Sequence, residues 1–449
     1  MSMPVATENM VLLKPTLHVE VIVKKQKQST KPIDLHQLRR DLLQWFINCH
    51  ATVKVGQEIV LDGDEPCLEL VERVDVADYT GPPNTLGYFD TDSVQLDLQA
   101  YIFRAESEPE GRRSIRQDAD ADMPQARVLA LPNVILKDES DSLVFDDGLP
   151  SRLLRYLVRM IGMMRQPGLT LATFNWNRLC LLHGPPGSGK STLCRALAQK
   201  LSIRLGQTFP RATLIELNTS SMLSKYFGES GKLISATFER IHAAAQDPGT
   251  LICVVMDEVE TIAGSRERST ASGECNDGMR ATNQLLTALD RLRHLPNVIV
   301  LCTSNLISAI DQAFLDRVDI KQLVPSPSPA AIYNILRSCL NELIRSNLVN
   351  APTTTVQTPE TWTLLSSTPE LPTLSHVQIH LMDPTHSHTP GYRVWALAAQ
   401  KCSGFSGRTL RRLPILGLAM YTWGGESVTL DEVVAALEAA VEQELKAMK

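Results

Sequence analysis

An eight-residue stretch near the middle of the chain constrains the fold more than any other. It satisfies the pattern G-x-x-x-x-G-K-[ST] at every fixed position and consists of Gly184, Pro185, Pro186, Gly187, Ser188, Gly189, Lys190 and Ser191. An apolar run at residues 179–183 precedes it, and apolar residues at helical spacing follow it as far as Leu201. The order of strand, glycine-rich loop and helix predicts a phosphate-binding unit of an α/β fold.

Each residue type in this loop has a physical reason to be there. Gly184, Gly187 and Gly189 allow backbone angles that a Cβ atom would forbid, so several N–H groups can point at one anion. The helix that follows directs its positive end at the same place. Lys190 is then expected to reach the β- and γ-phosphates of ATP, and the Ser191 hydroxyl to bind Mg²⁺.

The composition limits the class of protein. At 449 residues the chain has room for about two to four domains. A net charge of −6 argues against a generally basic nucleic-acid binder, so we expect no direct nucleic-acid binding. Nine dispersed cysteines are typical of a reducing compartment, and no signal peptide or membrane-spanning run is evident. We therefore expect an intracellular protein that does not contact membranes.

The chain before the glycine-rich loop divides into two parts. Residues 1–104 contain an alternating apolar stretch at 17–23, an amphipathic helical pattern at 33–47 and several short apolar runs. They predict a mixed α+β domain without a catalytic motif, suited to holding a substrate or adaptor. Residues 105–127 are charged and nearly lack large apolar side chains, which predicts a solvated linker.

Residues 128–324 have the pattern of a large α/β domain. Apolar runs at 179–183, 213–217, 251–256 and 298–301 alternate with helical segments, beginning with an amphipathic stretch at 151–163. Alternating strands and helices predict a doubly wound parallel sheet. Ligands bind at the carboxyl ends of such strands, so chemical groups placed there are candidates for a site.

Two carboxylates follow the apolar run 251–256, namely Asp257 and Glu258. Downstream of a phosphate-binding loop, Asp257 is expected to bind Mg²⁺ and Glu258 to accept a proton from the attacking water. The alternative is a helix N-terminus enriched in acids, since Glu260 is acidic too. The presence of the loop favours the catalytic interpretation.

Two further candidate site residues lie later in the large domain. Asn305 is the last residue of Thr303-Ser304-Asn305, which ends the strand predicted at 298–301, and a neutral side chain there can orient water or sense the γ-phosphate. Arg317 lies in the sequence DRVD, just beyond the last helix of the large domain. An arginine at such a place can neutralise charge in the transition state, in its own subunit or in a neighbour.

Taken together, these motifs resemble those of the AAA+ ATPases. They occur in the order GPPGSGKS, VVMDE, TSN, DRVD and, at residues 406–408, SGR. The resemblance is closer to the family of pachytene checkpoint protein 2, also called thyroid receptor-interacting protein 13. It is carried by SKYFGESGKL, AFLDRVDIKQ and GFSGRTLRRLP, spans most of the chain from residue 131 onward, and has its clearest earlier trace in HVEVIVK at 18–24.

The resemblance assigns roles to particular residues. It implies that Tyr226 and Phe227 lie on a loop facing the pore of a homohexamer and grip the substrate chain. It implies that Arg317 is a finger reaching a neighbour's nucleotide, that Arg408 is a sensor contacting nucleotide from its own lid, and that Asn305 is the first sensor. Many members of the superfamily have two arginines before DRVD, whereas here only Arg317 is evident.

The last part of the chain, residues 325–449, is expected to form a small helical lid. A proline-rich hinge at 325–329 opens it, and a final helix begins at Thr429, where Thr429 and Glu432 form a capping box. Residues 350–393 are rich in Thr, Pro, Ser and His, and they exceed the usual link between lid helices. We interpret most of that segment as an insertion forming a surface loop.

Three functional hypotheses follow. The first, implied by the family, is ATP-driven conversion of HORMA-domain proteins from a closed to an open form, with a HORMA-fold adaptor, in the spindle checkpoint and in meiosis. Such a protein is expected in the nucleus and cytoplasm. The second is a motor acting on DNA, which the absence of a strongly basic N-terminal domain disfavours. The third is a nucleotide-gated scaffold, which the presence of Glu258 disfavours.

Overall fold

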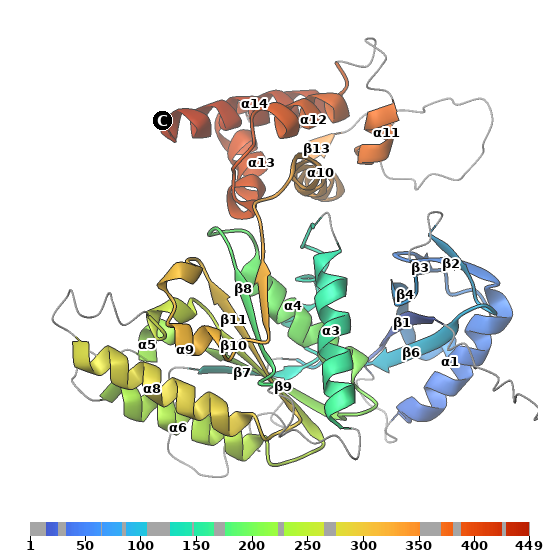
Figure 1. Ribbon diagram of the computed structural model, residues 1–449. Coiled ribbons are helices and arrows are strands. Elements are labelled where there is room, and N and C mark those ends of the chain that lie inside the picture. Colours follow the sequence, from blue (N-terminus) through green and yellow to red (C-terminus); the bar gives the residue numbers. More distant parts are fainter. Residues whose placement is uncertain are drawn as a thin grey trace, which may run out of the picture.

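The computed structural model describes residues 15–25, 33–63, 65–82, 87–105, 126–145, 148–165, 176–222, 229–264, 275–350, 370–379, 388–423 and 428–448. These residues form an N-terminal domain, a central domain built on a six-stranded sheet, and a C-terminal lid (Figure 1). Within these ranges, no helix is both long enough and apolar enough to cross a membrane.

The N-terminal domain packs one long helix against a four-stranded sheet of order β3-β4-β1-β6. Strand β1 pairs antiparallel with β4 and parallel with β6. Apolar residues on one face of β1 and β4 enclose Trp45 and Phe46 of the helix, which agrees with the predicted α+β domain. The elements are β1 (Thr16–Val23), α1 (Leu35–Cys49), β2 (Thr52–Lys54), β3 (Glu58–Ile59), β4 (Val71–Tyr79), β5 (Tyr88–Asp90) and β6 (Gln95–Tyr101), with a short 3₁₀ helix at Leu68–Leu70.

The central domain has a mixed sheet of order β12-β8-β11-β10-β9-β7. Five strands are parallel, as predicted, and β7 lies antiparallel at one edge. The strands are β7 (Ala126–Leu131), β8 (Leu179–His183), β9 (Arg211–Leu217), β10 (Thr250–Met256), β11 (Val298–Ser304) and β12 (Ile320–Leu323). The sheet starts two residues earlier than the expected boundary at 128, because Ala126 and Arg127 already pair with Leu217 and Glu216.

Helices cover both faces of this sheet, which explains why its strands are apolar at nearly every position. Leu179 and Leu181 face one layer, whereas Cys180 and Leu182 face the other. The helices α3 and α4 lie on the side of the N-terminal domain, and α6 and α8 lie on the opposite side (Figure 1). The helices are α3 (Leu149–Met164), α4 (Lys190–Arg204), α5 (Thr219–Met222), α6 (Glu229–Ala244), α8 (Cys275–Leu292) and α9 (Gln312–Leu315), with 3₁₀ turns at Val134–Leu136, Val259–Thr261 and Ile307–Ala309.

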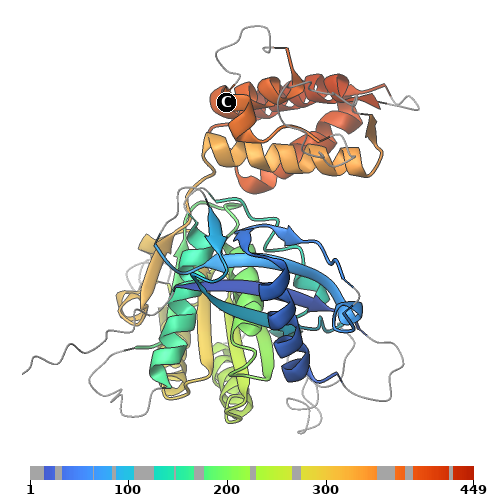
Figure 2. The same ribbon diagram turned by 90° about the vertical axis from the view of Figure 1, so that its right-hand side faces the viewer.

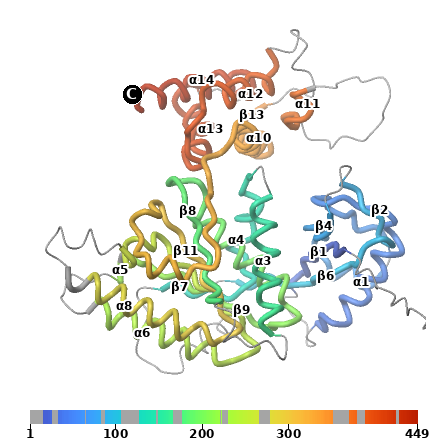
Figure 3. The backbone as a smooth tube through the Cα atoms, viewed as in Figure 1, coloured from blue at the N-terminus to red at the C-terminus, as the bar shows by residue number. Residues whose placement is uncertain are grey.

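Ion pairs join the N-terminal domain to α4, the helix that begins at the glycine-rich loop. The backbone course of both parts can be followed in Figure 3. Glu20 of β1 is almost fully buried, and its Oε2 lies 2.6 Å from Nζ of Lys200. Arg204, one turn further along α4, lies 3.9 Å from the other oxygen of the same carboxylate. Another ion pair, of 3.0 Å between Lys137 and Glu72, joins the N-terminal domain to the turn after β7 and lies nearer the surface. The N-terminal domain therefore rests on the end of α4 that is remote from the loop.

The lid lies above the central domain, which it joins through the chain that continues from the carboxyl end of β12 (Figure 2). The predicted capping box is present, with the Thr429 hydroxyl accepting from the Glu432 amide and the Glu432 carboxylate accepting from the Thr429 amide. The lid adds a short parallel pair of strands that the sequence did not indicate. Its elements are α10 (Pro329–Arg345), β13 (Val349–Asn350), α11 (Leu374–Ile379), α12 (Pro390–Gln400), α13 (Gly407–Tyr421), β14 (Val428–Thr429) and α14 (Leu430–Ala447).

Part of the segment that we interpreted as an inserted surface loop, 350–393, belongs to the lid core. Leu371 and Val377 are buried among the lid helices. The Leu371 amide donates to Asn341 Oδ1 at 2.9 Å, and its carbonyl accepts from Arg337 Nε at 2.8 Å. Helix α12 begins at Pro390, inside the range that we interpreted as the insertion. Residues 351–369 and 380–387 lie outside the described residues.

Replacing Leu371 by alanine tests this packing. We expect Leu371→Ala to lower the free energy of unfolding of the lid by about 2–5 kcal/mol, because it empties a buried site that cannot collapse fully. Leu348→Ala is the matched control, since Leu348 is 56% exposed and a substitution there should change stability by less than about 0.5 kcal/mol. Urea denaturation of the full-length protein measures both. Equal midpoints for the two variants would place Leu371 outside the core.

Candidate nucleotide site

The glycine-rich loop lies between β8 and α4, as the sequence predicts. Gly187 and Gly189 have positive φ angles of 72° and 94°, a region that other residues rarely enter. Gly189 caps α4 without a side-chain hydrogen bond, so the first amides of the helix are left for a ligand. The Ser188 hydroxyl oxygen is buried without a hydrogen-bond partner. These features fit an anion held by main-chain amides.

Two of the glycines are required by close contacts as well. A Cβ atom on Gly184 would lie 2.2 Å from the carbonyl oxygen of Val324, where β12 ends. A Cβ atom on Gly187 would lie 2.8 Å from the side chain of Ser406, at the start of α13. The loop is therefore pressed against the last strand of the sheet on one side and against the lid on the other.

Lys190 is the first residue of α4 and is almost buried. Its ammonium group donates to the carbonyl oxygens of Gly184 at 2.9 Å and Pro185 at 2.7 Å. Burial lowers the pKa of Lys190, and the nearby carboxylates of Asp257, Glu260 and Glu258 oppose that shift. The lysine thus lies between the loop and an acidic group of side chains.

The two predicted metal-binding residues are in contact. The Ser191 hydroxyl donates to Asp257 Oδ1 at 2.6 Å, although 66 positions separate them in the sequence. Hydroxyl and carboxylate oxygens are hard ligands of the kind that Mg²⁺ takes when it also binds phosphate oxygens. The residues present therefore fit a magnesium ion.

Glu258 has φ 51° and ψ 54°, a left-handed conformation that costs about 1–3 kcal/mol in a non-glycine residue. Its Oε1 accepts a hydrogen bond of 3.1 Å from Nδ2 of Asn305, which follows the neighbouring strand β11. The main-chain N–H of Asn305 donates to Glu260 Oε1 at 2.9 Å. The structure thus brings together Glu258 and Asn305, which the sequence analysis selected separately.

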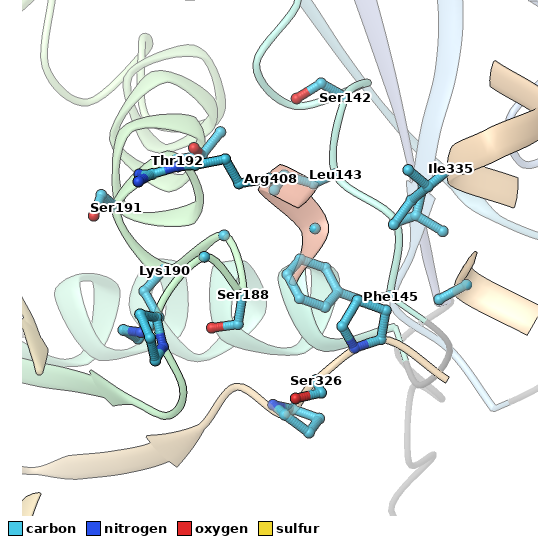
Figure 4. Close-up of a pocket in the computed structure, with 18 of the residues that line it drawn as sticks. Ser142, Leu143, Phe145, Ser188, Lys190, Ser191, Thr192, Ser326, Ile335 and Arg408 are labelled. Carbon is cyan, nitrogen blue, oxygen red and sulfur yellow. The ribbon is translucent and has the colours of Figure 1, made fainter. Parts of the chain in front are cut away.

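These groups line one cavity of about 730 Å³ between the central domain and the lid (Figure 4). The Arg408 side chain extends from the start of α13 toward the first turn of α4, which carries Ser191 and Thr192. The predicted residues in the lining are Pro186, Gly187, Ser188, Gly189, Lys190, Ser191, Asp257, Glu258, Asn305 and Arg408.

Arg317 does not line this cavity. Its Nε and Nη2 atoms each donate to the Asp290 carboxylate of α8 at 2.8 Å, and Nη1 donates to the carbonyl of Ala313 at 2.8 Å. The Asp290 hydrogen bond raises the pKa of Arg317. Within one chain, the arginine is therefore apart from the other predicted groups. Tyr226 and Phe227 lie outside the described residues.

Sequence reasoning missed several residues of the site. The segment 142–145 forms one wall, with Phe145 facing the loop (Figure 4), and no motif indicated it. Residues 325–328 of the proline-rich stretch, which we interpreted only as a hinge, supply a second wall. Thr303 is the first residue of the TSN motif, but the motif does not indicate that its side chain is buried in β11. The other unpredicted lining residues are Thr192, Arg195, Ala331, Ile335, Gly407 and Arg411.

Comparison with known proteins assigns the chain to a family. The model of the AAA family, the ATPase family associated with various cellular activities, matches residues 180–326. The TRIP13 N-terminal domain model matches residues 12–106, and the TRIP13-like AAA+ ATPase lid model matches residues 328–445. The chain is 33% identical to the human pachytene checkpoint protein 2 homolog, over 97% of this chain and 94% of the relative. It belongs to the pachytene checkpoint protein 2 family.

Further relatives agree with this assignment. The zebrafish (Danio rerio) pachytene checkpoint protein 2 homolog is 32% identical over 96% of this chain and 95% of its own length. The solved structure of PCH-2 from C. elegans superimposes with a TM-score of 0.71 at 25% identity, covering 96% of this chain and 99% of that one. Membership of this family makes the chain an AAA+ ATPase that binds ATP.

A bacterial structure shares the fold at lower similarity. The solved HORMA:CdnC:Trip13 complex of E. coli MS115-1 matches with a TM-score of 0.51 at 18% identity, covering 71% of this chain and 97% of that one. At 18% identity, the similarity shows a shared fold and nothing more.

Replacing Gly184 by alanine tests the close contact on which the loop depends. We expect ATP to bind about 10- to 100-fold more weakly, because the new Cβ must push the loop away from Val324 and the strain costs about 1–3 kcal/mol. Gly162→Ala is the matched control, since Gly162 is exposed on α3 and has no atom near the new Cβ. Titration with a fluorescent ATP analogue measures affinity. Unchanged affinity in Gly184→Ala would contradict the role of this contact.

Proposed function

We propose that this ATPase converts HORMA-domain proteins from a closed to an open form, with the N-terminal domain holding the substrate or a HORMA-fold adaptor. The observation that carries the proposal is that a TRIP13-type N-terminal domain rests directly on the helix leading from the nucleotide loop. A domain in that place can present a substrate to the motor that the loop drives. The solved pairing of the E. coli Trip13 with a HORMA protein guides the choice of substrate.

Within the cavity, we assign a role to each group. Glu258 accepts the proton of the attacking water, and Asn305, which donates to the Glu258 carboxylate, keeps it in place. Ser191 and Asp257 hold Mg²⁺, which when bound neutralises charge on the phosphates. Lys190 and the loop amides bind the phosphate oxygens, and Arg408 contacts the nucleotide from the lid, so lid position depends on what is bound.

In this proposal, the nucleotide site of one subunit is completed by an arginine from a second subunit. Arg317 is bound to Asp290 away from the cavity of its own chain, so it can act on phosphate only across an interface. We therefore propose a homohexamer in which Arg317 serves the neighbour's nucleotide and the loop bearing Tyr226 and Phe227 grips the substrate in the central pore. By family, the protein acts in the spindle checkpoint and in meiotic chromosome-axis control, in the nucleus and cytoplasm.

Glu258→Gln tests the catalytic assignment and the substrate together. We expect ATP to bind normally but hydrolysis to fall by about 10²–10⁴-fold, because the amide cannot accept the proton. The stalled protein should retain a purified closed HORMA-domain protein in the presence of ATP. Glu239→Gln is the control, since the Glu239 side chain is 69% exposed on α6. Phosphate release and co-elution on size exclusion measure the two effects.

The outcomes separate the two parts of the proposal. Near-normal phosphate release by Glu258→Gln would refute the role of Glu258. Lost hydrolysis without HORMA retention would refute the substrate. In the same assay, Tyr226→Ala should retain ATP hydrolysis and lose HORMA opening; normal opening would remove Tyr226 from the substrate path.

Arg317→Ala tests the shared site. We expect each subunit to keep its ATP affinity while hydrolysis falls by about 10³–10⁵-fold, the contribution of an arginine finger. Mixing Arg317→Ala with Glu258→Gln subunits should restore part of the activity, because some interfaces then pair an intact arginine with an intact glutamate. Arg40→Ala, an exposed substitution on α1, serves as control. If no mixture recovers activity, the arginine does not act across an interface.

A further inference from the structure

A threonine in β11 lies at the point where the ladder between β10 and β11 stops. The last paired residues are Met256 of β10 and Cys302 of β11. The next residue of β11 is Thr303, which lies beside Asp257 and is only 1% exposed. The structure thus places a buried hydroxyl group against the two carboxylate residues that directly follow β10.

Both hydrogen-bonding capacities of this hydroxyl are used for those two residues. The Thr303 Oγ1 donates to Oδ1 of Asp257, the same oxygen that accepts from Ser191. It accepts, at 3.0 Å, from the main-chain amide of Glu258. A hydroxyl has one proton to donate and can accept at its lone pairs, so one atom satisfies both neighbours at once. Hydrogen bonds to a carboxylate are about twice as strong as those between neutral groups.

The amide that Thr303 holds belongs to the residue with left-handed backbone angles. Such a conformation persists in a non-glycine residue only where several contacts fix it. At Glu258 the contacts are the Thr303 hydroxyl on the amide, Thr261 on the carbonyl at 2.9 Å, and Asn305 on the carboxylate at 3.1 Å. Of these three partners, Thr303 is the one whose side chain is buried, and its hydroxyl holds the backbone from which the Glu258 side chain departs.

We propose that Thr303 is a positioning residue of the ATPase site, whose hydroxyl sets the Asp257 carboxylate and the Glu258 backbone relative to each other. The proposal rests on the role of Glu258 given above. The separation between a metal ligand and the base on the next residue determines whether an attacking water meets the phosphate in line. A displacement of about 1 Å in such a group costs as much as 10²-fold in rate.

Thr303→Val tests this role, because valine keeps the branched shape and removes the hydroxyl. We expect kcat to fall by about 10- to 100-fold, while KM and the affinity for a fluorescent ATP analogue stay within threefold of the wild type. Thr303→Ser restores the hydroxyl and should recover most of the lost rate. Thr282→Val is the matched control, since Thr282 is a buried threonine of the same domain whose hydroxyl contacts the carbonyls of Ile262 and Gly278 only.

A double-variant cycle then separates positioning from general destabilisation. If Thr303 acts through Glu258, adding Thr303→Val to Glu258→Gln should reduce hydrolysis no further, and nucleotide affinity should stay unchanged. Independent, multiplying losses would overturn the proposal, as would a Thr303→Val rate equal to that of Thr282→Val or a failure of serine to recover activity. A Glu258→Gln variant with normal hydrolysis would refute the role of Glu258 and this inference together, whereas a normal Thr303→Val beside an impaired Glu258→Gln would refute the inference alone.

Discussion

The close approach of the glycine-rich loop to its neighbours is the constraint on which the described structure depends. At Gly184 the loop meets the end of β12, and at Gly187 it meets the first turn of α13, with no room for a side chain at either point. The loop therefore joins the sheet to the lid as well as binding phosphate. A displacement of the loop therefore changes its contact with the lid directly, because protein interiors are close-packed and do not deform continuously.

The sequence predicted the parts of this protein whose physics is local. The glycine-rich loop, the apolar strands and the capping box at Thr429 each depend on residues within a few positions, and all are present. What it could not show depends on pairing between distant segments. The antiparallel direction of β7 follows from its pairing with β9, far along the chain. Leu371 lies in a stretch of loop-like composition, yet its burial is decided by Asn341 and Arg337 on α10.

The candidate site shows the same division. Residue types at the ends of strands were enough to select Asp257, Glu258 and Asn305. The contacts among them, and the wall formed by residues 142–145, arise only when the sheet and the lid assemble. Arg317 differs from these residues. The DRVD sequence around it indicated a role in the site, yet within one chain its side chain lies away from the cavity. That separation is what a site completed by another subunit requires.

Helix α4 has an effect on motion that follows from its two ends. Its first residue belongs to the nucleotide loop, and its last turns carry Lys200 and Arg204, which hold the nearly buried carboxylate of Glu20. Fifteen residues of helix behave as a stiff rod about 22 Å long. Rotating the N-terminal domain away from this rod would break the contacts of Glu20 with Lys200 and Arg204 and would expose all three charges to water. The ion pairs at the far end of α4 fix the N-terminal domain to the same helix that begins at the nucleotide loop, so a tilt of α4 changes the position of both.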